Sequence, residues 1–396
     1  MDSWIEMGLV NKLAYARKVL PGAMWRGLRS SVAGPVHLIF VLADHFEPAI
    51  DAQDGRKRVS RFEQERRVEW WCREYPKIAD RWRDEEGRPF VHTYFYPAEQ
   101  YDEGLVAALA EHCRQGWGEI EVHLHHGIFE PDTAENTRRQ LVEFRDILAF
   151  RHRCLAVEEG SAEARYAFVH GNWALANSAG GELCGVDSEM QILAETGCYA
   201  DLTMPTSVLN RAQIGKINSV YECALPLDQA APHRKGNDLV AGRAAKTFPL
   251  IIQGPLVADI GRTLRRRKPA IENGEINERS AMTIERLALW KQAQVGVAGR
   301  PDWIFIKLHC HGMHPNQRDA VAGEAFGKFM EDLVGGAPER KETLHFVSAR
   351  EMTNILLAAC DGRGGNPGDY RDYRFQRLAA VAMPENSRPV PVSQKG

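Results

Sequence analysis

The sequence predicts an α/β fold, a (β/α)7–8 barrel-like domain of the parallel type. Three observations lead to this prediction: short apolar runs recur along the chain, helical patterns lie between several of them, and many of the runs end in polar residues. Strands that alternate with helices form parallel β/α units with right-handed crossovers. Seven or eight such units indicate a closed or nearly closed barrel.

The apolar runs are expected to be the strands. In chain order they lie at 37–43, 89–96, 119–124, 165–169, 201–204, 250–253, 303–308 and 344–347. Segment 210–240 is rich in Pro, Gly, Asn and charge, and it is too long for a plain connection. We therefore expect it to be a loop excursion over the mouth of the barrel.

The helices are expected from apolar residues at helical spacing. This spacing appears at Leu141, Phe144 and Leu148, around 105–113, and from about 319 to 333. Ser188 and Gln191 form a capping-box pair, which predicts a helix that Gly197 ends. We expect three parts in all: a helical segment over 1–34, the barrel over 35–360 and an irregular tail over 361–396.

Composition limits the possible functions. The chain has 396 residues, is 44% hydrophobic and 26% charged, and has a net charge of -3, which does not favour a nucleic-acid partner. It has no apolar run long enough to span a membrane and no signal-peptide pattern, and its eight cysteines include no C-x-x-C pair. A cytoplasmic location is expected, with segment 9–25 as the only candidate for peripheral membrane contact.

The residues at the predicted strand ends carry the functional signal. Asp44 and His45 follow the first strand, and more than half of the 14 histidines lie in four such segments. These segments are 44–48, 123–127, 170–173 and 309–315. Because the carboxyl ends of parallel strands meet at one rim, the side chains are expected to converge there.

Converging imidazoles and carboxylates suggest a divalent metal ion, with zinc as the best match. Such an ion makes a nucleophile of bound water near neutral pH. His123 and His126 are the favoured ligands, and His125 is a close competitor because it shares a strand face with His123. Asp44 is expected to be a ligand or the general base, and His45 beside it can take the other role.

At these residues the sequence resembles a divergent polysaccharide deacetylase of the NodB-homology type. Segment 42–46 (LADHF) stands where that family has T-F-D-D-G, and 119–127 (EIEVHLHHG) resembles its histidine motif. Segments 168–173 and 192–201 resemble the third and fourth motifs, and 305–309 (FIKLH) resembles the closing L-x-H. Here Asp44-His45 replaces the paired aspartates, Gly127 stands at the second motif histidine, and the arginine of the third motif is absent.

The resemblance implies hydrolysis of an N- or O-acetyl group on a sugar, with His309 as the general acid. In a cytoplasmic protein the substrate is expected to be a small-molecule or lipid-linked sugar intermediate of surface polysaccharide assembly. The residues expected to bind the sugar are Tyr94, Tyr96, His170, Asn172, Trp173 and His311.

Three other functions are compatible with the same residues. His123-Leu124-His125 also occurs as a motif type in amidohydrolases and PHP-type phosphoesterases, although there it belongs to the first strand. A barrel glycoside hydrolase needs two facing carboxylates, which Asp44, Glu47, Glu99 and Asp201 could supply. The third alternative is an inactive barrel that binds sugars.

Overall fold

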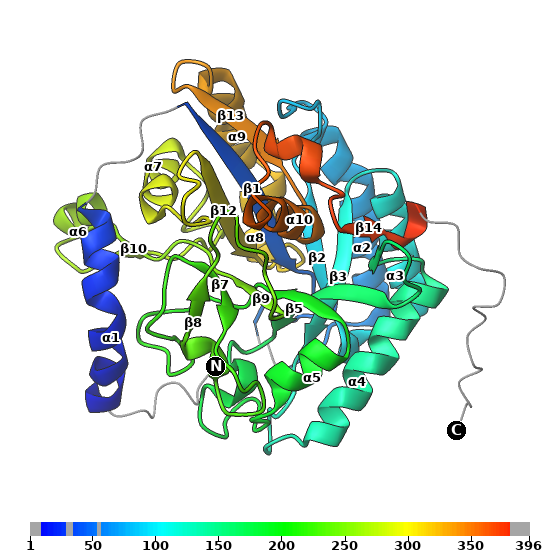
Figure 1. Ribbon diagram of the computed structural model, residues 1–396. Helices are drawn as coiled ribbons and strands as arrows, with labels where there is room; N and C mark the ends of the chain where they lie inside the picture. The colour runs from blue at the N-terminus through cyan, green and yellow to red at the C-terminus, as the bar shows by residue number, and fades with distance from the viewer. Residues whose placement is uncertain (1–8, 29–34, 54–56, 381–396) are drawn as a thin grey trace.

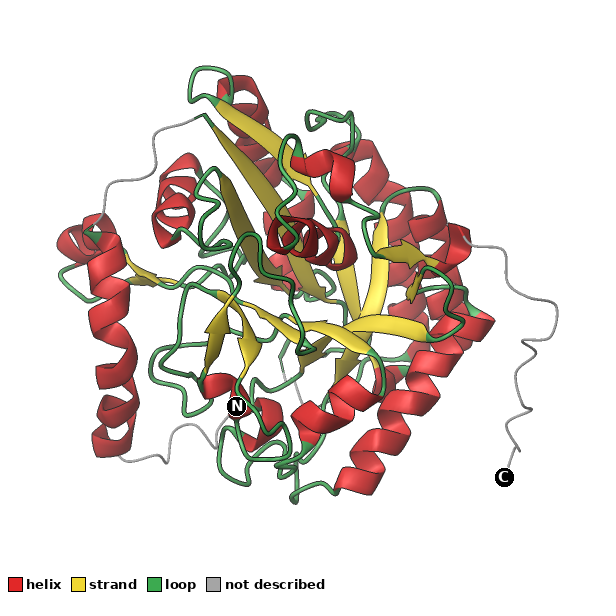
Figure 2. Cartoon of the chain, viewed as in Figure 1, coloured by secondary structure: helices red, strands yellow, loops and turns green. Residues whose placement is uncertain are grey.

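The computed structural model describes residues 9–28, 35–53 and 57–380. Its centre is a 12-stranded, mostly parallel sheet with helices packed against it, so the predicted α/β class is confirmed (Figures 1 and 2). The strand order is β12-β1-β2-β3-β5-β6-β9-β7-β8. Within the described residues β12 and β8 do not pair with each other, so the sheet is not closed and a complete barrel is not confirmed.

Seven of the eight expected strands lie where predicted, whereas the one expected at 201–204 is shifted, since β6 ends at Asp201, where that run begins. Eight strands form at or next to the predicted runs. They are β1 Val36–His45, β2 His92–Pro97, β3 Gly118–Leu124, β5 Ala164–His170, β6 Cys198–Asp201, β9 Leu250–Ile252, β12 Trp303–Cys310 and β13 Glu342–Phe346. Shorter strands complete the sheets: β4 Ala156–Glu158, β7 Val220–Cys223, β8 Gly236–Asp238, β10 Val257–Ala258, β11 Ile271–Glu272 and β14 Phe375–Arg377. β1 lies at the centre, because it pairs in parallel with β12, β13 and β2.

The helices connect these strands. They are α1 Leu9–Gly27, α2 Arg61–Ala79, α3 Glu103–Arg114, α4 Ala134–Asp146, α5 Glu189–Glu195, α6 Ile260–Arg266, α7 Ile284–Ala293, α8 Pro315–Ala322, α9 Glu324–Gly336 and α10 Ala349–Cys360. Local signals explain several boundaries. The Thr133 side chain accepts a hydrogen bond from Asn136 N at the start of α4, and Ser348 forms a capping box with Glu351 at the start of α10.

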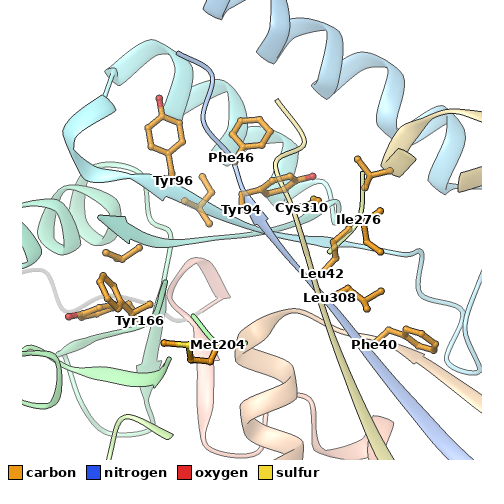
Figure 3. Packing of buried hydrophobic residues seen from close by; sticks show 14 of the residues in the cluster. Phe40, Leu42, Phe46, Tyr94, Tyr96, Tyr166, Met204, Ile276, Leu308 and Cys310 are labelled. Carbon is orange, nitrogen blue, oxygen red and sulfur yellow. The ribbon is translucent and has the colours of Figure 1, made fainter. Parts of the chain in front are cut away.

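The two faces of the sheet have separate apolar cores. One core includes Phe40 and Leu42 of β1, and it packs beneath the surrounding helices (Figure 3). The other includes Ile39 and Val41 of the same strand together with apolar residues of α10, since successive side chains of a strand point to opposite faces. Every residue of α10 is buried, and Figure 1 shows the sheet curving around this helix. We call the face that α10 covers the inner face.

The inner face also carries polar groups. Arg350 of α10 is only 1% exposed, and its Nη2 donates to Glu119 Oε1 at 2.8 Å. It also donates to the backbone oxygens of Arg371 and Phe375. Arg350 therefore joins α10, β3 and the segment that contains β14.

Several expectations need correction. Segment 319–333 is not one helix, because Gly323 separates α8 from α9 where a Cβ would lie 2.6 Å from Asp319 O. The Ser188 capping box does not form, although α5 begins at the next residue. The excursion at 210–240 contains β7 and β8, which extend the sheet in antiparallel fashion.

The two ends of the chain also differ from expectation in part. The expected irregular tail is ordered over 367–380, where β14 pairs with β4 and Arg371 donates to Asp84 and Glu86. Residues 381–396 lie outside the described residues. The expected N-terminal helix is present as α1, while 1–8 and 29–34 lie outside the description. No helix in the described ranges is long and apolar enough to cross a membrane.

We predict that Arg350→Met destabilises the protein by about 3–5 kcal/mol, because the largely buried Glu119 carboxylate loses its closest cation and keeps only Arg377, whose Nε lies 3.7 Å away. Chemical denaturation measures this change. As a matched control, Arg139→Ala removes a 57%-exposed side chain that pairs with Glu143 on α4, and it should change the stability by less than about 0.5 kcal/mol. Equal effects of the two substitutions would contradict the role given to Arg350.

Candidate metal centre

Three imidazole and carboxylate side chains meet at the carboxyl end of the sheet. The ligating atoms of His45, Glu47 and His123 all lie within 4.8 Å of one another, and the three residues are buried. His123 Nε2 lies 3.5 Å from Glu47 Oε1. His125 and His311 flank the group, each with its Nε2 3.9 Å from the same oxygen. We call these five residues the Glu47 cluster.

Strand geometry accounts for this convergence. His45 ends β1, and His123 is the last inner-face residue of β3, after Glu119 and Glu121. Glu47 lies two residues beyond His45, in the turn that follows β1. His311 follows β12, the neighbour of β1 in the sheet, and its ring centroid is 4.7 Å from that of His45.

Hydrogen bonds hold two of the rings in orientation. His123 Nδ1 lies 2.9 Å from Val169 O, which can only accept, so the proton is on Nδ1 and Nε2 has a free lone pair. His125 Nδ1 lies 2.7 Å from Glu99 Oε1 in the same way. In metal sites the ring nitrogen that does not bind the ion usually donates a hydrogen bond to a carbonyl or carboxylate, as here.

Buried nitrogen atoms without partners point to a missing ligand. His123 Nε2, His45 Nδ1 and His311 Nδ1 are buried and have no hydrogen-bond partner. A buried polar atom left unsatisfied costs about 1–3 kcal/mol. The donor set of the Glu47 cluster fits a divalent metal ion, because coordination would satisfy such atoms and imidazole with carboxylate suits zinc.

The protonation states also suit metal binding. Burial and neighbouring imidazoles lower the pKa of His45, and burial lowers that of His123 although Glu47 partly opposes it, so both rings are neutral at pH 7. Burial alone would raise the pKa of Glu47, but the nearby His123, His125 and His311 outweigh it and hold the pKa at about 2. A neutral imidazole and an ionised carboxylate are the forms that bind metals.

Asp44 lies in a different group. Its Oδ1 accepts from Gly312 N at 2.6 Å, and its Oδ2 is 2.9 Å from His92 Nδ1, with Cys310 close by. Asp44 precedes His45 on β1 and so points to the opposite face of the sheet. Its predicted role as ligand or base stays a prediction, and the carboxylate that the structure brings to the histidines is Glu47.

The structure separates His125 from His126. His125 borders the Glu47 cluster, whereas His126 Nε2 lies 2.9 Å from Glu189 Oε1 and its Nδ1 2.9 Å from Asp132 Oδ2. His170, expected to bind substrate, lies beside Glu189 as well. Of the two competing ligands, His125 is therefore the one that the structure brings to Glu47.

His309 lies beside the cluster on β12. Its ring centroid is 6.4 Å from that of His45, and its Nδ1 has no hydrogen-bond partner. Burial, followed by the charge of Lys307, lowers the pKa of His309 well below its usual value. The ring is therefore neutral at pH 7.

Two of the expected sugar-binding residues need correction. Tyr94 and Tyr96 are fully buried in the apolar core on the face of the sheet opposite the inner face (Figure 3). The Tyr94 hydroxyl donates to Trp117 O at 2.9 Å and accepts from Trp71 Nε1 at 3.1 Å. Their positions on β2 point them away from the inner face, so they cannot stack on a sugar there.

Asn172 and Trp173 lie in the turn after β5, both half-buried, and Trp173 packs in part against the core. Their predicted contact with substrate stays a prediction. The sequence offered Glu47 and Glu99 only as carboxylates of a possible glycosidase, and it did not predict their contacts with the candidate metal ligands. The period-two spacing of His45 and Glu47 was the available signal for Glu47, while the pairing of Glu99 with His125 depends on how β2 and β3 lie side by side.

The comparison with models of known protein families and with curated proteins gives no match. The resemblance to deacetylases therefore comes from the sequence motifs alone. The geometry of the Glu47 cluster is the separate observation that points to a metal site.

We predict that His123→Ala removes one equivalent of bound divalent metal per chain, because it deletes a buried nitrogen directed at the cluster. Elemental analysis of protein purified with and without added zinc measures the loss. His152→Ala is a matched control: His152 is also buried, but it pairs with the Tyr101 hydroxyl at 3.0 Å and belongs to none of the candidate metal groups found among the described residues. Full metal content in His123→Ala would remove His123 from the ligand set.

Proposed function

We propose that this protein is a metal-dependent hydrolase that removes an acyl group from a carbohydrate, with the curved sheet as a divergent NodB-type barrel. The observation that supports this proposal is the Glu47 cluster, in which imidazoles from distant segments surround one carboxylate at the carboxyl end of the strands. Function in β/α folds is concentrated at this end.

His45, Glu47 and His123 are the residues that would hold the ion, with zinc as the best match to the donors. When bound, a divalent ion activates solvent near neutral pH and polarises an acyl carbonyl. His125 and His311 border the same space and are partly exposed, with 16% and 22% of their side chains accessible. They are the groups of the cluster that a substrate reaches first.

His309 is the proposed proton carrier. Because the ring is neutral at pH 7, it first takes up a proton at Nδ1 and then releases it to the departing amine or hydroxyl. In the balanced reaction, the water oxygen bonds to the acyl carbon, the bond from that carbon to the sugar nitrogen or oxygen breaks, and one proton of the water passes to the sugar. Proton transfer of this kind contributes about 10²–10⁴-fold to a rate.

Asp44 acts in this proposal as a positioning residue. It accepts a hydrogen bond from Gly312 N and so fixes the turn that presents His311 to the cluster. The fit is tight, since a Cβ at Gly312 would lie 2.4 Å from Asp44 Oδ2. The turn after β12 is thus tied to β1 by a contact between the Gly312 backbone and the Asp44 side chain that leaves no room for a Cβ.

The acetylated sugar substrate, an intermediate of surface polysaccharide biosynthesis, is proposed from the resemblance to deacetylases. All eight cysteines are free, as expected in a reducing compartment, which supports the proposed cytoplasmic location. Near the end of α1, Trp25 is 66% exposed and Leu28 71%. These side chains could support the peripheral membrane contact that a lipid-linked substrate requires.

We predict that the protein releases acetate from acetylated amino sugars or their nucleotide-linked forms and that a chelator abolishes this activity. Added zinc should restore it, and His123→Ala should remain inactive under both conditions. Acetate is measured by a coupled assay or by NMR. Glycosidic cleavage that survives the chelator would instead support a carboxylate-pair glycosidase.

We predict that Gly312→Ala lowers kcat by about 100-fold, because a displacement of about 1 Å at a reacting group has an effect of this size. The new methyl group displaces either Asp44 or the turn that holds His311. Gly335→Ala in α9 is the matched control, since a Cβ there meets nothing within 4 Å. An unchanged kcat in Gly312→Ala would exclude the positioning role of Asp44.

A further inference from the structure

A second group of metal-ligating side chains lies outside the Glu47 cluster. It consists of His126 after β3, His170 at the end of β5, Cys184 in the following loop and Glu189 at the start of α5. The ligating atoms of these four buried residues lie within 4.8 Å of one another. The four segments meet only in the folded chain, since 63 positions separate His126 from Glu189.

We propose that these four residues form a second, closed metal site that binds a zinc-class ion and has a structural role. Two imidazoles, a thiolate and a carboxylate are all ligands that zinc accepts, and four protein ligands are the usual complement of a structural zinc site. The Glu47 cluster differs because two of its histidines are partly open to solvent. This second site is independent of the proposed hydrolase activity.

The distances fit a tetrahedral site with small adjustments. Glu189 Oε1 lies 3.8 Å from His170 Nε2 and 2.9 Å from His126 Nε2, while Cys184 Sγ lies 3.5 Å from Glu189 Oε2. Ligand bonds of ~2.0–2.3 Å in a tetrahedron place the ligand atoms ~3.3–3.8 Å apart. His170 Nε2 is buried, faces this group and has no hydrogen-bond partner, which is the state of a ligand atom without its metal.

Each of three ligands has the supporting contacts that metal sites use. His126 Nδ1 lies 2.9 Å from Asp132 Oδ2, and Glu189 Oε2 accepts from Ala176 N at 2.6 Å. Cys184 Sγ accepts from two backbone N–H groups, of Asn177 at 3.4 Å and Val186 at 3.5 Å. N–H groups directed at sulfur stabilise the thiolate form that binds metal, and a carboxylate behind a histidine fixes its tautomer.

One contact must change when an ion binds. Asn172 N donates to His170 Nδ1 at 3.2 Å, whereas coordination through Nε2 places a proton on Nδ1. That long hydrogen bond therefore opens in the metal-bound state. Without a metal ion, a protonated His126 donates hydrogen bonds to both Asp132 and Glu189. In that arrangement His170 Nε2 has no hydrogen-bond partner among the described residues.

A metal ion at this second site would hold the loop after β5 in place beside the Glu47 cluster. At Gly127 a Cβ would lie 2.2 Å from Cys184 O, so the two loops are in close backbone contact there. A Cβ at Gly171 would lie 2.2 Å from the His125 ring. Because Gly171 follows His170 directly, an ion held by His170 fixes the backbone against which His125 packs.

Cobalt substitution tests this proposal without any measurement of activity. The full-length protein is stripped of metal and titrated with Co²⁺, and the thiolate-to-cobalt charge-transfer absorption in the near ultraviolet is recorded. The wild type should bind two equivalents and show this absorption. Cys184→Ala should lose the absorption and one equivalent, whereas His123→Ala should lose one equivalent and keep the absorption.

Cys310→Ala is the matched control, because Cys310 is buried beside Asp44 and His92 and is the other cysteine found in a candidate metal group of the described residues. It should keep the absorption. The absence of thiolate absorption in the wild type, or its survival in Cys184→Ala, would overturn the proposal. If Cys184→Ala does not fold, zinc-edge X-ray absorption of the wild type decides, with one sulfur ligand per two zinc ions expected and none contradicting the proposal.

Discussion

The approach of His45 and His123 to the Glu47 carboxylate inside the protein is the interaction on which this account depends. Imidazole nitrogens that are removed from water and left without partners are unfavourable, and here several of them meet at one place. Coordination of a cation is the interaction that offsets this cost most directly, because it uses lone pairs that no donor among the described residues reaches. The pKa shifts of His45 and His123 agree, since these two rings are neutral beside an ionised carboxylate, whereas Glu99 and Glu47 outweigh burial and raise the pKa of His125 to about 8.

The fold makes this arrangement possible by keeping water out of the inner face. α10 fills the space that the curved sheet encloses, and Arg350 on that helix pairs with Glu119. Lys307 lies farther along the same face, whereas the register of β6 places Asp201 on the opposite face, and both charged groups are buried. Burial, partly opposed by the other charge, lowers the pKa of Lys307 to about 7 and raises that of Asp201 to about 7. The polar groups of the centre are thus continuous with a buried polar interior.

The sequence predicted the positions of the strands well, but it did not predict whether the sheet closes into a barrel. A buried parallel strand is a local apolar run, so seven of the eight predicted runs coincide with strands, and the histidines at the strand ends were found with them. Whether the two edge strands of the sheet, β12 and β8, pair with each other depends on the curvature of the whole sheet, which no local pattern determines. The position of α10 inside the curve likewise depends on long-range packing and not on its own residues.

The same difference between local sequence patterns and long-range packing explains which site residues were predicted correctly. His45 and His123 lie on strands, where the alternation of side chains predicts the face. Glu47 and His126 lie in the segments after β1 and β3, and Glu99 lies in a 3-10 helix after β2, where the direction of a side chain is harder to predict from the sequence pattern than on a strand. Tyr94 and Tyr96 were misplaced because aromatic residues at a strand end suit a sugar surface and an apolar core equally, and only the pairing of β2 shows which face they share.

The most direct test is anomalous diffraction from crystals of the zinc-loaded protein, with data collected on both sides of the zinc absorption edge. The account predicts an anomalous peak at ~2.0–2.2 Å from nitrogen atoms of His45 and His123 and from a Glu47 oxygen. Well-ordered density for these three side chains with no peak between them, from protein that contains zinc, would contradict it.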